Sequence, residues 1–178
     1  MNAAVEAFTE AGFENTTVSD VVHRAGMTPS TFYNYYRDKD ALRDELVAAA
    51  AGRMIRALAE IRTKSSGAED YFRASSRRLF AAVVADPSIS TLLRRNLPHL
   101  RSLLDDKALK PVYAAIRTDI ETFATRGMMD PIDAEYAGAV LRASAVEIAV
   151  VLLSRPEADV EAAVEFLTRV LGAAFRFR

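Results

Sequence analysis

Residues 15–42, NTTVSDVVHRAGMTPSTFYNYYRDKDAL, constrain the fold of this chain more than any other stretch. Thr17 stands before a segment whose apolar residues recur at helical spacing, so it is placed to cap a helix. Thr28 is placed to cap a second helix, in which Pro29 takes the first position, where its missing N–H costs nothing. Gly26 lies between them and can adopt the positive φ of a sharp turn. The pattern predicts two short helices and a glycine turn, followed at once by a long helix, and is typical of a helix-turn-helix.

The second short helix, predicted over roughly Pro29–Tyr36, has a polar exposed face. Phe32 and Tyr36 are four residues apart and can anchor one face in the core. The other faces offer hydroxyls, an amide, a phenol and cations that can hydrogen-bond phosphates and base edges, namely Ser30, Thr31, Tyr33, Asn34, Arg37 and Lys39. A solvated polar face beside an aromatic core is the alternative. The ordered caps, glycine turn and aromatics favour DNA binding.

Many positions of this segment agree in order and spacing with one family signature: Phe8, Gly12-Phe13, Thr17-Val18, Asp20-Val21, Ala25-Gly26-Met27-Thr28, Thr31-Phe32-Tyr33, Tyr35-Tyr36, Lys39-Asp40 and Leu42. The first quarter of the chain thereby resembles the N-terminal domain of TetR-type (tetracycline-repressor-like) transcriptional regulators. The resemblance implies an all-helical homodimer that represses transcription and leaves its palindromic operator DNA when a small-molecule effector binds the C-terminal domain. It implies phosphate contacts by Thr17, Thr28, Tyr33 and Lys39, and base contacts by Ser30, Thr31, Asn34 and Tyr35.

The charge of this segment is unusual for a DNA-binding domain. Residues 1–45 carry four cations and eight carboxylates, although acids at helix starts can serve as caps. The family usually has a basic lead-in, whereas this chain starts at Met1, already inside the first helix, so either the protein starts upstream or phosphate contacts have been lost. We therefore expect weaker or more salt-sensitive DNA binding. The alternative function is a helical small-molecule-binding or interaction protein that has lost DNA binding.

Composition excludes several classes of protein. The chain has no Cys, which excludes disulfides and thiolate sites and fits a reducing cytoplasm. No signal peptide is visible, and the longest apolar run, Ala145 to Leu153, contains Glu147 and is too short to span a bilayer, so we expect a soluble, cytoplasmic protein without a membrane partner. The two histidines, His23 and His99, lack partners at ligand spacing. With no catalytic motif either, we expect no metal, no cofactor and no enzymatic activity.

Further helices are predicted along the whole chain. Their expected ranges are 2–11, 39–62, 69–85, 88–95, 99–104, one that opens at 111 and ends before 127, 133–154, and one that opens at Pro156. Residues 63–67 read as a linker. We therefore expect an all-α protein in which a three-helix DNA-binding domain (residues 1–45) is joined by a long helix to a helical ligand-binding and dimerisation domain (residues 46–178).

The helix predicted over residues 133–154 is apolar on nearly every side. Such a helix must be covered all round, and one domain of this size hardly supplies the cover. The last two helices would therefore pair with their symmetry mates in a four-helix bundle, which makes a homodimer. The alternative is a fully internal core helix.

Arg142 is a charged residue inside this apolar helix and needs a partner or water. It either forms an ion pair within one subunit or between two subunits, or reaches into the ligand cavity and meets an anionic effector; Glu135 lies on the same helix face as Arg142. Phe80, Tyr113 and Phe123 are candidates to line the same cavity.

Overall fold

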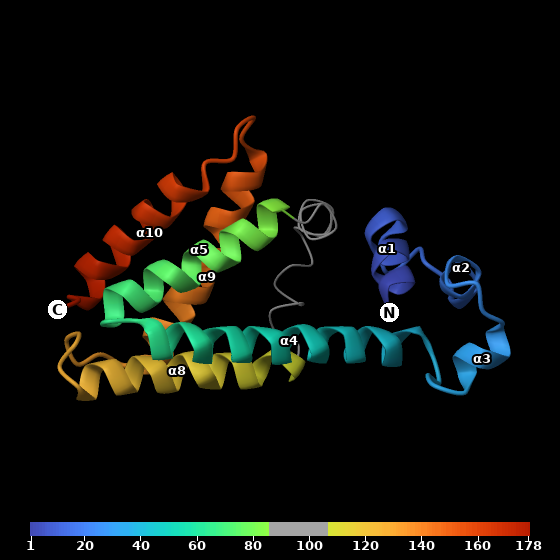
Figure 1. The fold of residues 1–178 in the computed structure, drawn as a ribbon, viewed down its shortest axis with the longest axis horizontal. Coiled ribbons are helices and arrows are strands. Elements are labelled where there is room, and N and C mark those ends of the chain that lie inside the picture. The colour runs from blue at the N-terminus through green and yellow to red at the C-terminus, as the bar shows by residue number, and fades with distance from the viewer. Residues whose placement is uncertain (86–106) are drawn as a thin grey trace.

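The computed structural model describes residues 1–85 and 107–178, and within these ranges all regular structure is helical (Figure 1). The elements are α1 (Asn2–Ala11), α2 (Val18–Arg24), α3 (Pro29–Tyr33), α4 (Lys39–Lys64), α5 (Ala68–Ala85), the short 3-10 helix η2 (Lys107–Leu109), α8 (Lys110–Thr125), α9 (Ala134–Ser154) and α10 (Val160–Phe175). The all-α fold class is confirmed. The two short pieces predicted at 88–95 and 99–104, and with them His99, lie outside the described residues.

Three predicted helix bounds were wrong, each for a local reason. Helix α3 ends at Tyr33, because the amides of Tyr35 and Tyr36 both donate to the carbonyl oxygen of Phe32 and close a turn there. Helix α10 begins at Val160 rather than at Pro156, since the carboxylate of Asp159 accepts the amide of Ala162 at 2.9 Å and caps the helix. Helix α4 continues to Lys64, so the expected linker shrinks to residues 65–67.

The N-terminal head consists of α1, α2, α3 and the start of α4 (Figure 1). Its core contains the buried side chains of Ala4, Ala7, Phe8, Val21, Val22, Phe32 and Leu42. Thr16 is 1% exposed in the α1–α2 turn, and its hydroxyl donates to the carbonyl oxygens of Ala7 at 3.1 Å and Gly12 at 2.7 Å. These bonds fix the angle between α1 and α2, on which the position of α3 depends.

The C-terminal body contains α5, α8, α9, α10 and the second half of α4. Helix α10 packs along α5, and α8 runs beside α4 (Figure 1). Two ion pairs join α5 to α10, Arg73–Glu165 at 2.5 Å and Arg77–Glu161 at 2.7 Å. Helix α4 belongs to both parts, because Leu42 lies in the core of the head and Leu58 in the core of the body. The predicted boundary at residues 45/46 falls inside this continuous helix and stays a prediction.

Helix α9 is long and apolar enough, by length and composition, to cross a membrane, and among the described helices it alone passes that test. Only 28% of its most apolar stretch is buried in the single chain. A helix of this kind needs apolar cover on its exposed faces.

Candidate functional site

Helices α2 and α3 are held in place by their caps. Thr17 and Asp20 form a reciprocal capping box, in which the amide of Thr17 donates to the Asp20 carboxylate at 2.7 Å and the Thr17 hydroxyl accepts the Asp20 amide at 3.2 Å. The Thr28 hydroxyl caps α3 by accepting the amide of Thr31 at 3.3 Å. Gly26 has a φ of 64°, which only glycine adopts without strain. The two helices thus form the turn geometry that the sequence predicted.

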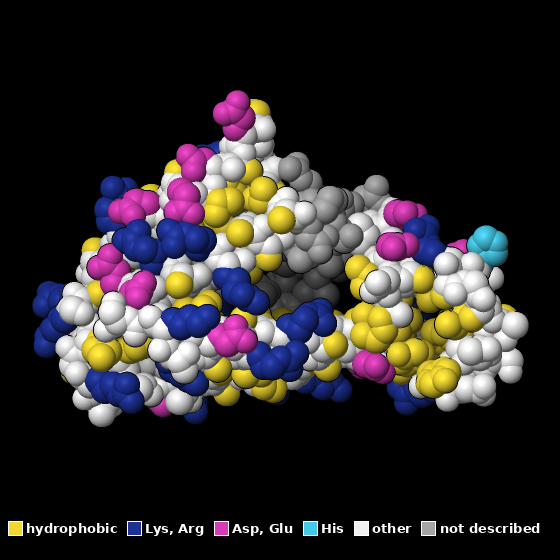
Figure 2. Space-filling model, viewed as in Figure 1, with side chains coloured by type: hydrophobic (Ala, Val, Ile, Leu, Met, Phe, Trp, Pro, Cys, Tyr) yellow, Lys and Arg dark blue, Asp and Glu magenta, His cyan; other side chains and the backbone are white. Residues whose placement is uncertain are grey.

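The polar side chains of α3 and its flanks face solvent. Tyr33 is 57% exposed and Tyr35 is 78% exposed. Four further residues predicted to contact DNA, Thr17, Thr28, Ser30 and Asn34, are exposed, and Thr31 is half-buried. Phe32 is 3% exposed and forms the apolar anchor of the helix. Figure 2 shows the tip of the head, where Figure 1 places α3, as a surface with few charged side chains.

Lys39 differs from the other predicted DNA contacts, because its ammonium group is engaged inside the head. It donates to the carbonyl oxygens of Phe13 at 2.6 Å, Thr16 at 2.8 Å and Glu14 at 3.3 Å. It also lies 4.3 Å from the centre of the Phe13 ring. An ammonium has three N–H donors, and here each has an acceptor. A phosphate contact by this residue stays a prediction, and it would have to replace one of these bonds.

The acidic residues of the head serve its own structure. Asp38 caps α4 through the amide of Ala41 at 2.8 Å, and this bond together with the neighbouring Arg37 lowers the pKa of the Asp38 carboxyl. Arg24 pairs with Glu10, which lowers the pKa of that carboxyl, and also with Glu6 at 3.6 Å. Residues 28–34, which contain most of the predicted DNA contacts, have no carboxylate. The negative charge of the head is therefore placed mainly outside α3.

The C-terminal body contains a partly open apolar cavity of about 240 Å³. Four helices and η2 line it, through Met54, Leu58, Tyr71, Phe72, Ser75, Ser76, Leu79, Leu109, Val112, Tyr113, Ile116, Leu141, Arg142, Ala145 and Val146. The hydroxyl oxygen of Ser75 is buried in this wall. A cavity with such a lining fits an apolar molecule or chain.

The four residues predicted to bind a ligand do not all lie at this cavity. Tyr113 and Arg142 line the cavity. Phe80 is fully buried in the core, and Phe123 lines a second pocket instead. The Arg142 guanidinium lies 4.4 Å from the centre of the Tyr113 ring, a cation–π contact. Among the described residues no carboxylate forms an ion pair with Arg142. The predicted partner Glu135 therefore does not hold it.

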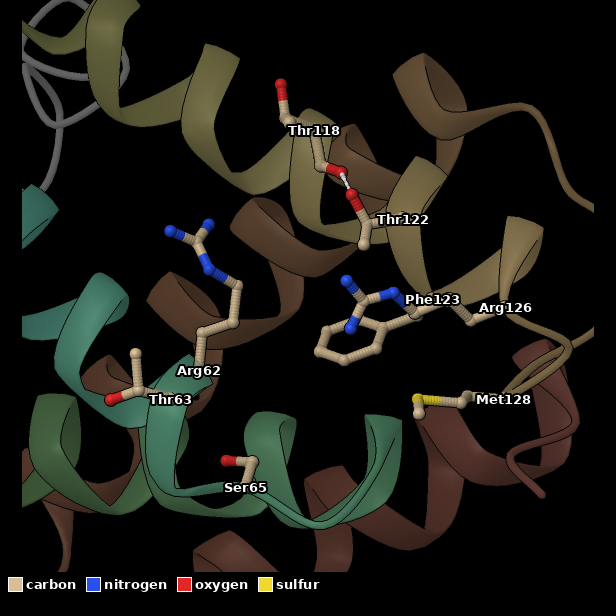
Figure 3. Close-up of a pocket in the computed structure, with 8 residues that line it drawn as sticks. All are labelled: Arg62, Thr63, Ser65, Thr118, Thr122, Phe123, Arg126 and Met128. Atoms are coloured by element: carbon tan, nitrogen blue, oxygen red, sulfur yellow. Dashed lines mark hydrogen bonds between the residues drawn. The ribbon is translucent and has the colours of Figure 1, made fainter.

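A second pocket, an open groove of about 630 Å³, lies between the C-terminal ends of α4 and α8 (Figure 3). Arg62 and Arg126 contribute the cations, and the Arg126 guanidinium lies next to the Phe123 ring in the view of Figure 3. Three of its hydroxyl groups donate to carbonyl oxygens of their own helices, namely those of Thr63, Ser65 and Thr122. Arg62 is already paired with the buried carboxylate of Asp119. The other N–H groups of Arg62 and those of Arg126 could still meet an anion, but the groove has a less apolar lining than the cavity and is therefore the weaker candidate for an apolar ligand.

Sequence reasoning missed most of the cavity and the carboxylate beside it. Met54, Leu58 and Leu79 looked like ordinary core positions, since helical periodicity does not separate the wall of a cavity from a filled core. Asp119 left a clearer signal, because it is a lone acid on the otherwise apolar face of Val112 and Phe123 in α8. As for metals, no group of three or more His, Cys, Asp or Glu side chains that could hold an ion occurs in residues 1–85 and 107–178.

Comparison with known proteins places the head in a family. Residues 1–46 match the family model of bacterial regulatory proteins of the tetR family. The uncharacterized HTH-type transcriptional regulator YvdT of Bacillus subtilis is 33% identical over 72 residues, which are 40% of this chain, and YdgC of the same organism is 38% identical over 47 residues, or 26% of it. These alignments span only 36% and 24% of the length of those two regulators. The family match in sequence is confined to the N-terminal head.

Similarity in structure extends over nearly the whole chain. The fatty acid degradation regulator FadR from Bacillus halodurans superposes with a TM-score of 0.82 at 20% identity and covers 99% of this chain and 94% of its own. FadR from Bacillus subtilis, in complex with stearoyl-CoA, has a TM-score of 0.83 at 19% identity, over 96% of this chain and 94% of that one. At such identities the likeness establishes the fold alone, a three-helix head followed by a helical body.

Proposed function

We propose that this chain, whose N-terminal domain belongs to the tetR family of bacterial regulatory proteins, is a cytoplasmic, ligand-responsive DNA-binding transcriptional regulator. One observation carries the proposal: the capped, solvent-exposed α3 is joined by the single helix α4 to a body with an apolar cavity. A reading helix and a ligand cavity that share one rigid element are the parts that such a regulator needs.

The proposed DNA contacts come from α3 and its flanks. Tyr33 and Thr28 would bind phosphates, while Ser30 and Asn34 would face base edges in a major groove. These side chains are exposed, and their backbone is fixed by the caps described above. Because the core of the head holds Phe32, α3 can lie in a groove without unfolding.

The proposed dimer forms through α9 and α10. Large apolar side chains are exposed on α9 at Tyr136, Val140 and Val151, and on α10 at Phe166 and Val170. A groove of about 590 Å³ lies between the two helices. A second copy would fill this groove and cover α9, in a four-helix bundle with two-fold symmetry. The two α3 helices would then enter major grooves about one helical turn, roughly 34 Å, apart on a palindromic operator.

The proposed effector places an apolar group in the 240 Å³ cavity. A long acyl chain is the first candidate class, because the structurally similar FadR from Bacillus subtilis is in complex with stearoyl-CoA. Arg142 is the one charged residue of the cavity wall among the described residues and would favour an anionic head group. Such a ligand shifts DNA affinity only by its difference in affinity for the DNA-bound and released states.

The test is binding of the purified protein to duplex DNA from around its own gene, titrated against salt. We expect saturable, sequence-selective binding that weakens steeply with salt. Tyr33→Ala should weaken binding at least tenfold, since removing one phosphate hydrogen bond at each of two half-sites costs about 1.4 kcal/mol or more in total. The control is Arg126→Gln, an exposed residue of the body.

A helical binding protein without DNA recognition is the second candidate function, and the net negative charge of the head favours it. In that case the protein would still bind an apolar ligand, but DNA binding would be weak, independent of sequence and the same in wild type and Tyr33→Ala.

A further inference from the structure

Three polar side chains form a chain across the body, from the wall of the cavity to α4. The hydroxyl of Tyr71, a cavity-lining residue of α5, donates to one oxygen of Asp119 at 2.5 Å. The other oxygen of Asp119 accepts from the guanidinium of Arg62, which lies near the C-terminal end of α4. Arg62 in turn lines the open groove of Figure 3. The three residues come from three different helices.

Asp119 depends on both partners. Its side chain is 1% exposed, and a buried carboxylate is costly unless hydrogen bonds and an opposite charge compensate for the lost water. Burial, together with the hydrogen bond and charge of Asp119, raises the pKa of Tyr71, so that its hydroxyl keeps its proton and stays a donor. Movement of Tyr71 would leave Asp119 with one compensating partner instead of two.

The position of Arg62 on α4 links the three polar side chains to the cavity a second time. Met54, Leu58 and Arg62 recur every four residues and so lie on one face of α4. The first two line the cavity, and the third ends the polar chain. At the opposite end of α4, Lys39 binds three carbonyl oxygens of the head. Helix α4 runs over 26 residues, and its two attachments at Lys39 and Arg62 lie about 35 Å apart along the helix axis.

We propose that Asp119 is a positioning residue that reports occupancy of the cavity to α4 through Tyr71 and Arg62. The inference rests on the proposed function. A ligand that displaces the Tyr71 ring breaks the bond from Tyr71 to Asp119, and Asp119 and Arg62 then adopt a second arrangement that shifts the C-terminal end of α4. The head follows because Lys39 fixes it to the same helix.

The first experiment measures coupling, which is the ratio of ligand dissociation constants with and without DNA. The ligand probes are straight-chain 1-alkanols and alkanoates from hexyl to stearyl length and stearoyl-CoA, and the DNA is a duplex enriched from a random pool by the wild-type protein. We expect a wild-type ratio of roughly ten or more. In Tyr71→Phe, which keeps the ring, we expect the ratio to fall towards one while each separate affinity stays within about threefold.

The matched variants separate coupling from stability. Asp119→Asn should behave like Tyr71→Phe if it folds, and Arg126→Gln, which changes the other arginine of the same groove, should keep the wild-type ratio. If the three residues only stabilised the fold, their substitution would lower the stability of the protein but would leave the ratio of ligand dissociation constants with and without DNA unchanged. That ratio depends on how differently the ligand binds the two conformational states of the protein. A wild-type ratio in a folded Tyr71→Phe protein overturns the proposal.

A second measurement needs neither ligand nor DNA. Hydrogen exchange of the free protein should be faster over residues 55–64 in Tyr71→Phe than in wild type or Arg126→Gln, with no change in α10. Unchanged exchange over residues 55–64 contradicts the proposal on its own. If instead no probe binds or no DNA is enriched, while the exchange changes as expected, the proposed function fails and the connection from Tyr71 to α4 stands.

Discussion

At the scale of single residues, two cations show how a side chain suited to bind a ligand can be held by the protein itself. Lys39 uses its three donors on the α1–α2 turn, and the Arg142 guanidinium stacks on the Tyr113 ring. Both positions were selected from the sequence because they place positive charge near expected DNA or ligand. Their contacts give each residue a second role that a substitution will also disturb.

Lys39→Met should destabilise the head. The substitution removes three hydrogen bonds to the carbonyl oxygens of Phe13, Glu14 and Thr16, at a cost of about 1–3 kcal/mol. Thermal unfolding followed by circular dichroism measures this cost, and Arg37→Met, at an 84% exposed side chain, is the control. Equal melting temperatures for wild type and Lys39→Met would contradict the internal role. DNA affinity of this variant is informative only at temperatures where its head is folded.

Arg142→Leu should separate ligands by charge. We expect little change in the affinity for a neutral 1-alkanol and about fivefold weaker binding of the alkanoate of equal length, as for a partly solvated ion pair worth about 1 kcal/mol. Titration calorimetry with both ligands tests this, with Arg126→Gln as the control. An equal loss for both ligands would mean that Arg142 supports the cavity wall through its contact with Tyr113.

At the scale of elements, the helix-turn-helix depends on its turn. Gly26 has a φ of 64°, and a Cβ built there meets no atom within 4 Å. Any penalty for a side chain at this position therefore comes from the backbone and not from crowding. The capping box of α2 and the cap of α3 flank the turn, so a strained turn would move both helices.

Gly26→Val should destabilise the head by about 1–2 kcal/mol, because a β-branched residue is strained at positive φ. Gly52→Ala is the contrasting variant, since Gly52 lies inside α4 and a Cβ there approaches only the flexible Arg56 side chain, at 3.6 Å. This change should raise stability by up to about 1 kcal/mol. Urea unfolding of both variants measures the difference, and a Gly26→Val protein as stable as wild type would show that the turn is not strained.

At the scale of the whole molecule, the exposed apolar faces of α9 and α10 require cover. Phe166 is 50% exposed and lines the groove between the two helices, and only 28% of the most apolar part of α9 is buried. Phe166→Glu should therefore shift the proposed dimer to monomers and lower operator affinity at least tenfold, since one head binds only one half-site. Sedimentation analysis measures the mass, with Ala158→Glu, in the exposed α9–α10 loop, as the control. A monomeric wild-type protein would overturn the proposed interface.

Local signals in the sequence determined the helical fold and the helix-turn-helix. Caps, a glycine turn and apolar spacing act between residues close in the chain, so the roles of Thr17, Gly26 and Thr28 follow from their immediate neighbours alone. The Asp159 cap that begins α10 is also local, but the nearer Pro156 gave a competing start signal and displaced the predicted helix.

Only the tertiary structure decided which side chains meet. Periodicity places Tyr113 and Phe123 on similar apolar faces of α8, yet one lines the cavity and the other lies at the open groove. The chain from Tyr71 through Asp119 to Arg62 joins residues 48 and 57 positions apart, and its partners follow from how α4, α5 and α8 pack. A sequence reports what each residue can do, whereas burial and distance, which set the strength of a charge or a hydrogen bond, arise only when the helices come together.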